Sequence, residues 1–205
     1  MSLSSISFNK RICLFLILFL FSISHKAFAE KNNIKPVINL PDAVAKLRAG
    51  NDIDAFLDFQ ILATEGNVDA QAYFGEMYRK GRGFGKNFIK AEEWLSKAAE
   101  GGSASAYHRL GWMYARGEIS GSRNNKMAVE NWKKASELGD PYAQSDLGVM
   151  YWRGEGTEKD LILAYKWLMT SFNQLGKENI NLDNLKKEMT LNEIDKANNM
   201  LTDVK

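Results

Sequence analysis

The segment Ala106-Tyr-His-Arg-Leu-Gly-Trp-Met-Tyr-Ala-Arg-Gly117 has a close copy on each side of it. The upstream copy reads Ala70-Gln-Ala-Tyr-Phe-Gly-Glu-Met-Tyr-Arg-Lys-Gly81, and the downstream copy reads Ala143-Gln-Ser-Asp-Leu-Gly-Val-Met-Tyr-Trp-Arg-Gly154. The copies begin 36 and 37 residues apart. A period in that range, with helical patterning inside each copy, predicts a stack of helix pairs rather than a single closed core.

Each copy has the pattern of the first helix of a pair. Apolar residues of the central copy recur at i, i+4, i+7 and i+8, which places them on one helix face that we expect to be buried. They are Ala106, Leu110, Met113 and Tyr114. A glycine inside this helix recurs in every copy, although glycine there costs about 1 kcal/mol relative to alanine. Its repetition predicts close approach of a partner helix at Gly75, Gly111 and Gly148.

A second helix is expected after each glycine-rich turn, beginning near Phe88, Asn125 and Leu161. A short polar residue precedes each start in the same register, and such a side chain can accept a hydrogen bond from the unpaired amides of a helix start. The predicted N-caps, including that of an N-terminal half repeat, are Asn51, Asn87, Asn124 and Asp160. The inner faces of the three second helices are expected to carry Leu95, Trp132, Leu168, Ala98, Ala135 and Ser171.

The residues before the repeats have the pattern of an export signal and a tether. Lys10 and Arg11 precede an apolar run from Ile12 to Ile23, and Ala27-Phe28-Ala29 offers the small residues that a signal peptidase reads. We therefore predict a signal peptide at 1–29 and a flexible tether at 30–40. The apolar run is shorter than the ~20 residues that a helix needs to cross a bilayer, so a retained membrane anchor is the less favoured alternative.

The register of the copies divides the rest of the chain. An N-terminal capping helix and half repeat are expected at 41–69, repeats at 70–105, 106–142 and 143–181, and a C-terminal helical cap at 182–205. Within that cap, Thr190 and Glu193 have the spacing of a capping box. The predicted fold class is all-α: an α-solenoid of antiparallel helix pairs with a C-terminal capping helix pair.

Charge and composition give no reason to expect a nucleic-acid partner. The chain has 27 basic and 25 acidic residues, and the predicted signal holds three of the basic ones and no acid. The exported remainder would therefore carry a net charge of −1. The single cysteine, Cys13, lies within the predicted signal, so the exported chain would fold without a disulfide.

The sequence shows no signature of catalysis, of a metal or of a cofactor. His108 is the only histidine after the predicted signal, and without cysteine it cannot complete a usual zinc set. We recognise no Ser/His/Asp or Cys/His arrangement, and the glycines between residues 81 and 85 follow a helix rather than a strand, which favours a turn over a phosphate loop. We therefore predict no catalytic, metal-ligating or cofactor-binding residue and no enzyme activity.

The repeated pattern reads Ala-x-x-x-Leu-Gly-x-x-Tyr-x-x-Gly-x-Gly, then a cap residue, Lys-Ala-x-x-Trp and Lys-Ala-Ala. It is clearest from Ala70 to Gly102, with Trp94 in place, whereas the middle copy has Asn131 at the Trp position and Trp132 beside it. This pattern resembles the Sel-like repeat family, a subfamily of the tetratricopeptide-type helical repeats. The resemblance covers about residues 51–176 and the helical cap. It implies adaptor or scaffold roles, which for exported bacterial members include envelope signalling, cell-wall or motility complexes and contact with host cells.

The resemblance also implies a concave groove, lined by the face of the first helices that turns away from the core. Positions two, six, nine and ten residues after the first Ala of each copy lie on that side. The predicted partner-binding residues are Glu76, Arg79, Lys80, His108, Trp112, Arg116, Ser145, Val149, Trp152 and Arg153. Two alternatives stay open: the tryptophans pack in the core, and the basic residues simply occupy helix C-termini, where cations are favourable.

We therefore hypothesise a non-catalytic, exported module that binds a protein or peptide partner. Trp112 and Trp152 would be exposed anchors, and Arg116 and Arg153 would meet carboxylates of the partner, since binding hot spots are enriched in Trp and Arg. A periplasmic regulatory subunit of an envelope-signalling or flagellar-motor complex is one alternative, and a cell-wall or β-lactam hydrolase is another. The periplasm is the favoured destination over secretion, without membrane insertion after signal cleavage.

Overall fold

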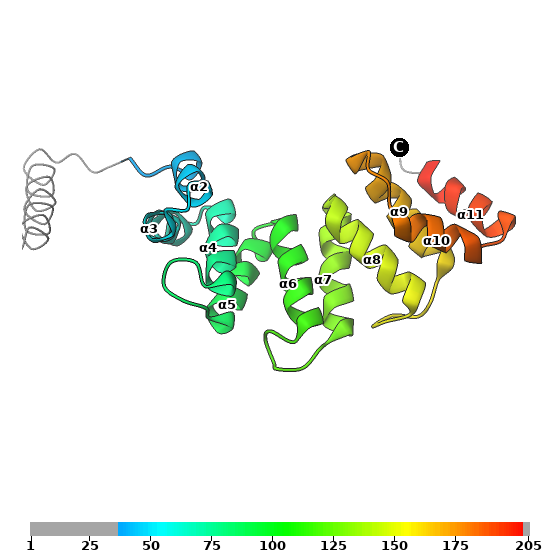
Figure 1. The fold of residues 1–205 in the computed structure, drawn as a ribbon, viewed down its shortest axis with the longest axis horizontal. Coiled ribbons are helices and arrows are strands. Elements are labelled where there is room, and N and C mark those ends of the chain that lie inside the picture. The colour runs from blue at the N-terminus through cyan, green and yellow to red at the C-terminus, as the bar shows by residue number, and fades with distance from the viewer. Residues whose placement is uncertain (1–36, 203–205) are drawn as a thin grey trace, which may run out of the picture. The chain divides into compact units, whose positions relative to one another are not determined.

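The structure, a computed structural model, describes residues 37–202, so the predicted signal and most of the predicted tether lie outside the described residues. Ten helices and no strand form within the described part (Figure 1). Their bounds are α2 Leu40–Arg48, α3 Asp52–Thr64, α4 Val68–Lys80, α5 Phe88–Glu100, α6 Ala104–Arg116, α7 Asn125–Glu137, α8 Pro141–Arg153, α9 Leu161–Leu175, α10 Ile180–Glu188 and α11 Leu191–Thr202. No helix between residues 37 and 202 is long and apolar enough to cross a membrane.

The helices pack in chain order, each against its neighbours. The most extensive contacts join α4 to α5, α6 to α7 and α8 to α9, which are the three predicted helix pairs. Contacts of α3 with α4, α5 with α6 and α7 with α8 link one pair to the next, while α2 packs on α3 and both α10 and α11 pack on α9. The predicted α-solenoid of helix pairs is confirmed.

The repeated glycines stand where the two helices of a pair touch, as predicted. A Cβ at Gly111 would lie 2.4 Å from Nε1 of Trp132 on the partner helix, a separation that real Cβ atoms do not show. A Cβ at Gly75 or Gly148 would lie 2.8 Å from the Cγ of Leu95 or Leu168. The helices of each pair are therefore closest at a position without a side chain, and a Cβ there would force its neighbours to move.

Polar caps begin nearly all of these helices. The side chains of Asn87, Asn124 and Asp160 accept backbone N–H groups at 3.0, 3.1 and 2.9 Å, as predicted. Asn51 stands at the N-cap of α3, as predicted, but the expected hydrogen bond is not formed, because its side chain accepts no backbone N–H there. Its backbone, at φ −79° and ψ 64°, departs from the extended shape of typical capping residues.

The first helices have caps that the repeat register did not reveal. Asn67, Ser103 and Asp140 accept the N–H groups of Ala70, Ala106 and Ala143 at the starts of α4, α6 and α8. These helices therefore begin two residues before the alanine that marks each copy. At the other end of the array, the predicted capping box forms: the Thr190 N–H donates to Glu193 at 2.8 Å, and the Glu193 N–H donates to Thr190 Oγ1 at 3.3 Å.

The core follows the seams between the helices. All six residues predicted for the inner faces of the second helices are buried. Leu185 of α10 and Ala197 of α11 are fully buried in the last apolar cluster, so the two terminal helices cover the end of α9. At the other end, Ile38 and Leu40 pack against the first cluster, and the end of the predicted tether is therefore part of the fold.

Candidate partner-binding groove

Three hollows lie in a row along the first helices, and together we name them the groove. The first, about 760 Å³, lies between α2, α4 and α6, and the second, about 440 Å³, lies between α4, α6 and the start of α8. The third, about 340 Å³, extends from α6 and α8 to the end of α9. Arg109 and Ser105 line both the first and the second hollow, and His108, Trp112 and Tyr142 line both the second and the third. The hollows are therefore contiguous.

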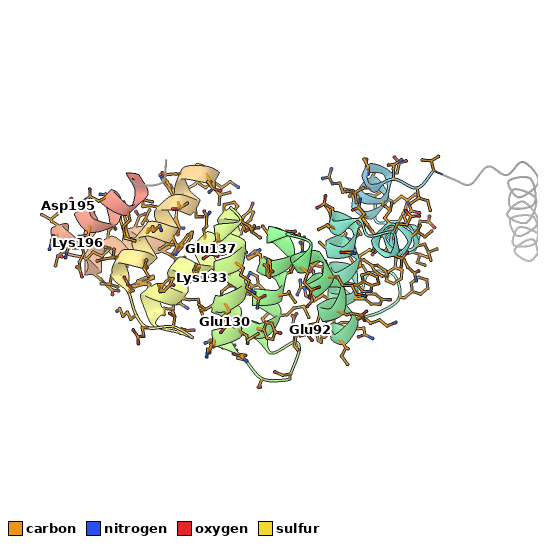
Figure 2. All side chains as sticks on the ribbon, turned by 180° about the vertical axis from the view of Figure 1, so that it is seen from behind. Glu92, Glu130, Lys133, Glu137, Asp195 and Lys196 are labelled. Atoms are coloured by element: carbon orange, nitrogen blue, oxygen red, sulfur yellow. The ribbon has the colours of Figure 1, made fainter. Side chains whose placement is uncertain are left out.

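The second helices show a different surface. On α7, Glu130, Lys133 and Glu137 are exposed in one stripe of mixed charge (Figure 2). Their spacing of three and four residues is that of a solvated helix face whose charges support one another. Glu130 and Lys133 line none of the hollows described above, whereas Glu137 lines a separate hollow of about 460 Å³ between the end of α7, α9 and the end of α11. The groove itself is lined mainly by the first helices, and α9 contributes to its third hollow.

One carboxylate at the edge of the second hollow holds several cations. Glu76 on α4 accepts two hydrogen bonds from Arg79, at 2.8 and 2.9 Å, and Lys80 lies 2.9 Å away. Arg109 of α6 approaches the same carboxylate only to 3.6 Å. Burial alone would raise the pKa of Glu76, but the hydrogen bonds from Arg79 and Lys80 and the nearby positive charges outweigh it and lower that pKa. Glu76 is therefore ionised at neutral pH.

A histidine stands between two repeats at the centre of the groove. Nε2 of His108 lies 2.8 Å from Oδ2 of Asp146, which belongs to the next first helix, α8. The indole Nε1 of Trp112, one turn along α6, lies 3.1 Å from the same histidine nitrogen. The ring of Tyr142 stacks on His108, with centroids 6.3 Å apart. One imidazole nitrogen therefore faces both a carboxylate and an indole N–H.

Trp112 joins the groove to the core behind it. Its ring meets that of Trp132 edge to face, with centroids 5.4 Å apart, and the Arg116 guanidinium lies 4.8 Å from the Trp112 ring centroid. Trp112 is half-buried and packs against the apolar cluster of the middle repeat, while Arg116 is exposed. The prediction that Trp112 is an exposed anchor is therefore wrong, although the residue does line the groove.

Comparison with known proteins agrees with this architecture. The Sel1 repeat family model matches residues 68–103, 104–140 and 141–168, and the matched segments begin at the first residues of α4, α6 and α8. The chain carries three Sel1 repeats. Sel1 repeats are a helical fold commonly used for protein–protein interaction and are generally a non-catalytic scaffold.

Two solved structures are similar to this Sel1 array. A Sel1 repeat protein from Oxalobacter formigenes shares 28% identity at a TM-score of 0.56, over 60% of this chain and 36% of that one. The protein c5321, a protective antigen present in uropathogenic Escherichia coli strains and displaying an SLR fold, shares 26% identity at a TM-score of 0.53, over 78% of this chain and 44% of that one. This chain thus spans less than half the length of either protein. No curated protein matches it.

Six of the ten predicted groove residues meet in the second and third hollows of the Sel1 array. They are Glu76, Arg79, His108, Trp112, Arg116 and Ser145. The other four line none of the three hollows. Val149 and Trp152 are half-buried against the last apolar cluster, so Trp152 is not the predicted exposed anchor. Lys80 pairs with Glu76, and Arg153 lies 3.9 Å from Glu155.

The groove also holds residues that the sequence prediction missed. The residue just before the first Ala of each repeat lines it, and so does the residue three positions after that Ala. These residues are Asp69, Ser105, Tyr142, Tyr73, Arg109 and Asp146. At about 100° per residue, the position before the Ala lies between the predicted columns, and the position three residues after it lies just beyond them. Counting every position on that helix face would therefore have included both.

The groove brings together groups that deserve a test for catalysis. His108 and Asp146 form a pair that the sequence did not reveal, but neither Ser105 nor Ser145 is hydrogen-bonded to His108 within residues 37–202. Ser105 contacts Ser103 at 3.2 Å, and Ser145 accepts from Asn179 at 3.4 Å. Neither serine is therefore paired with His108 in the way that a nucleophile is paired with its general base. In the same range, no group of three acidic, His or Cys residues could hold a metal ion.

Proposed function

We propose that this Sel1 array is a protein-interaction module that binds an extended segment of a partner protein along the groove. The observation that carries the proposal is the continuity of the three hollows, which share lining residues from one repeat to the next. A compact ligand would fill one hollow, since pockets of about 300–1,000 Å³ suit single small molecules. An extended peptide contacts all three hollows.

The chemistry of the lining supports a peptide as the occupant. Tyr142 is 57% exposed between the second and third hollows, and Arg116 is exposed beside the Trp112 ring. Tyr, Trp and Arg are the residue types that contribute most to protein–protein binding energy. Tyr142 stacks on His108, and Arg116 lies over the Trp112 ring. These ring contacts order both side chains before binding, which lowers the entropy lost on association.

Photo-crosslinking tests the location of binding. Peptides of about 12 residues are selected by phage display on the purified full chain, and p-benzoylphenylalanine is placed either at Tyr142 or at Ile89. Ile89 is 78% exposed and lines none of the hollows, so it is the matched control. We expect the selected peptides to crosslink at position 142 and not at 89. Equal crosslinking at both positions, or no enriched peptide, would refute the proposal.

We further propose that this binding takes place in the bacterial envelope, with the periplasm as the favoured compartment. The support is the export signal predicted at residues 1–29, with its basic residues before an apolar run and small residues at the cleavage site. Fusing residues 1–29 to a β-lactamase reporter tests this, and we expect ampicillin resistance in the host. A fusion that is made but leaves its host sensitive would place the protein elsewhere.

A further inference from the structure

We propose that the first hollow receives one large apolar side chain of the bound segment and thereby selects which segments the groove binds. This inference deepens the proposed function and rests on it, because the hollow is one end of the same groove. Arg109 and Ser105 line both the first and the second hollow, so a segment that lies in the second hollow can continue into the first. Three features of the molecule support the proposal: the walls of the first hollow, the change in lining along the groove and the fixed position of α2.

The walls of the first hollow are mostly apolar and are accessible in the unbound chain. Pro41 and Ala45 of α2 are exposed, and Leu40, Val44 and Tyr73 are half-buried. Burying such surface under an apolar side chain is favourable in proportion to the area removed from water. The apolar and aromatic residues of the lining are Leu40, Pro41, Val44, Ala45, Ala72 and Tyr73.

The lining changes in character from one end of the groove to the other. The position three residues after the first Ala of each repeat holds Tyr73, then Arg109, then Asp146. Apolar and aromatic residues form most of the lining of the first hollow but only a minority in the second and the third. An apolar side chain of the bound segment therefore buries most apolar surface in the first hollow, where a charged side chain would lose water against apolar walls.

Charges border the first hollow without favouring one sign. Its lining includes Arg48, Asp69 and Arg109, and Arg109 also lies 3.6 Å from the Glu76 carboxylate. Both an acidic and a basic side chain would thus meet a like charge there. The first hollow is also the largest of the three, at about 760 Å³. This size favours a long or aromatic side chain, because aromatic side chains bury about 150–250 Å² each.

α2, which supplies four of the apolar lining residues, is held on the array before binding. Asn39 caps its start by accepting the Asp42 N–H at 3.0 Å. Near its end, Arg82 of the loop after α4 donates to the Leu47 carbonyl at 2.8 Å. Ala43, on the inner side of α2, is fully buried in the first apolar cluster. A wall that is already ordered lowers the entropy lost when a side chain binds against it.

An alanine scan of each selected peptide that crosslinks at position 142 tests for the apolar residue. Fluorescence anisotropy measures the Kd of every alanine variant for the purified full chain. We expect one large apolar residue whose replacement weakens binding about tenfold or more, as loss of a buried apolar side chain does. That residue is then replaced by p-benzoylphenylalanine, which is itself large and apolar, and the crosslinked position is mapped by mass spectrometry. We expect the crosslink to fall on residues 40–48 or on Tyr73.

Ala45→Glu tests the receiving side, with Ile53→Glu as its matched control. Both are exposed apolar residues on neighbouring helices, but Ile53 lines none of the three hollows of the groove. Because both side chains are exposed and glutamate is a good helix former, both variants should fold, which circular dichroism checks. We expect A45E to weaken the parent peptide about tenfold and to leave the variant with alanine at the apolar position unchanged. I53E should affect neither peptide.

The outcomes separate this inference from the proposed function. Peptides that crosslink at position 142 but show no such apolar residue, or whose benzoylphenylalanine marks other parts of the chain, would overturn the apolar subsite and leave peptide binding standing. Equal losses with A45E and I53E, or an A45E loss that persists once the apolar residue is alanine, would overturn it as well. Absence of any peptide that crosslinks at position 142 would remove both proposals.

Discussion

The middle Sel1 repeat and its two neighbours share one helix-pair geometry but fill it differently. In the outer repeats Leu95 and Leu168 lie over the helix glycine, whereas in the middle repeat Trp132 lies over Gly111. The cause is an exchange of residue types at two positions: the middle repeat has Asn131 where the outer repeats have tryptophan, and Trp132 where they have leucine. Neighbouring positions on a helix differ by about 100°, so the tryptophan of the middle repeat faces the partner helix instead of lying beside that face.

This exchange connects the core of the middle repeat to the groove. The Trp132 indole donates to the carbonyl of His108 at 3.2 Å and meets the Trp112 ring edge to face, and Trp112 in turn contacts Arg116. In the outer repeats, Trp94 and Trp167 are half-buried and meet lysine ammonium groups instead. The contrast shows that one repeat can differ from its neighbours through an exchange of residues at two positions, while the helix-pair geometry stays the same.

The largest effect is expected from Gly111→Ala, compared with Gly148→Ala in the next repeat. At Gly111 the near atoms belong to the Trp132 ring, at 2.4 Å, which is rigid and held by its hydrogen bond. At Gly148 they are Leu168 Cγ at 2.8 Å and the Ala164 carbonyl oxygen at 3.0 Å, so the overlap to be relieved is smaller. Overpacking should destabilise G111A by about 3 kcal/mol and G148A by about 1 kcal/mol, since alanine regains about 1 kcal/mol of helix propensity. Urea unfolding followed by circular dichroism measures the difference.

A second substitution makes that prediction specific to the tryptophan. Replacing Trp132 by Leu copies the outer repeats, so the double variant G111A/W132L should be more stable than G111A alone. If W132L makes G111A worse, or if G148A costs as much as G111A, the middle repeat would not differ from its neighbours in the way that the contacts indicate.

The next largest effect is expected from Trp112→Ala. As an exposed anchor, Trp112 would contribute little to folding. Because Trp112 is half-buried against Trp132, its truncation should destabilise the array by about 2–3 kcal/mol, below the 3–5 kcal/mol of a fully buried tryptophan. R116A should change stability by less than about 1 kcal/mol, the range of an exposed cation–π contact. Equal midpoints of thermal unfolding for W112A and R116A would contradict this prediction.

The sequence predicted the fold well because its signals are local and repeated. The period, the helix glycines and three of the four caps depend on backbone geometry that each repeat imposes on itself. Asn51 failed because capping depends on the dihedral angles at the junction with α2, which no residue type reports. The site was predicted only in part, because the His108 to Asp146 pair depends on a contact between repeats, and the burial of Trp112 depends on its contact with Trp132 in the partner helix.

Glu76 of the first repeat occupies the position that Trp112 has in the middle repeat, so it extends the comparison between the repeats. Its pKa is lowered in the folded chain, so its contribution to stability is fully present above the ordinary value of 4.5 and is lost as the pH falls through the folded pKa. E76Q should cost about 2 kcal/mol at pH 7, the range of hydrogen bonds to a charged group.

The free energy of unfolding at acid pH distinguishes the titration of Glu76 from the titration of the other acidic residues. Below pH 4.5 the wild type should lose stability more steeply than E76Q, so the two curves converge. E93Q is the control, because Glu93 pairs with Lys97 on the exposed surface of α5, where ion pairs contribute little. A wild type and an E76Q variant that lose stability in parallel would show that Glu76 is not the group that titrates.

The smallest effect is expected at the helix N-caps, where the middle repeat is compared with the N-terminal half repeat. The Asn124 side chain accepts the Met127 N–H at 3.1 Å, so N124A should lose about 1 kcal/mol, typical of a removed N-cap. Asn51 makes no such bond, so N51A should change stability by no more than about 0.5 kcal/mol, as for other surface substitutions. N124D keeps an accepting oxygen at the same place and should stay close to wild type. Equal losses for N51A and N124A would mean that Asn51 caps α3 after all, and that the half repeat begins in the same way as the complete ones.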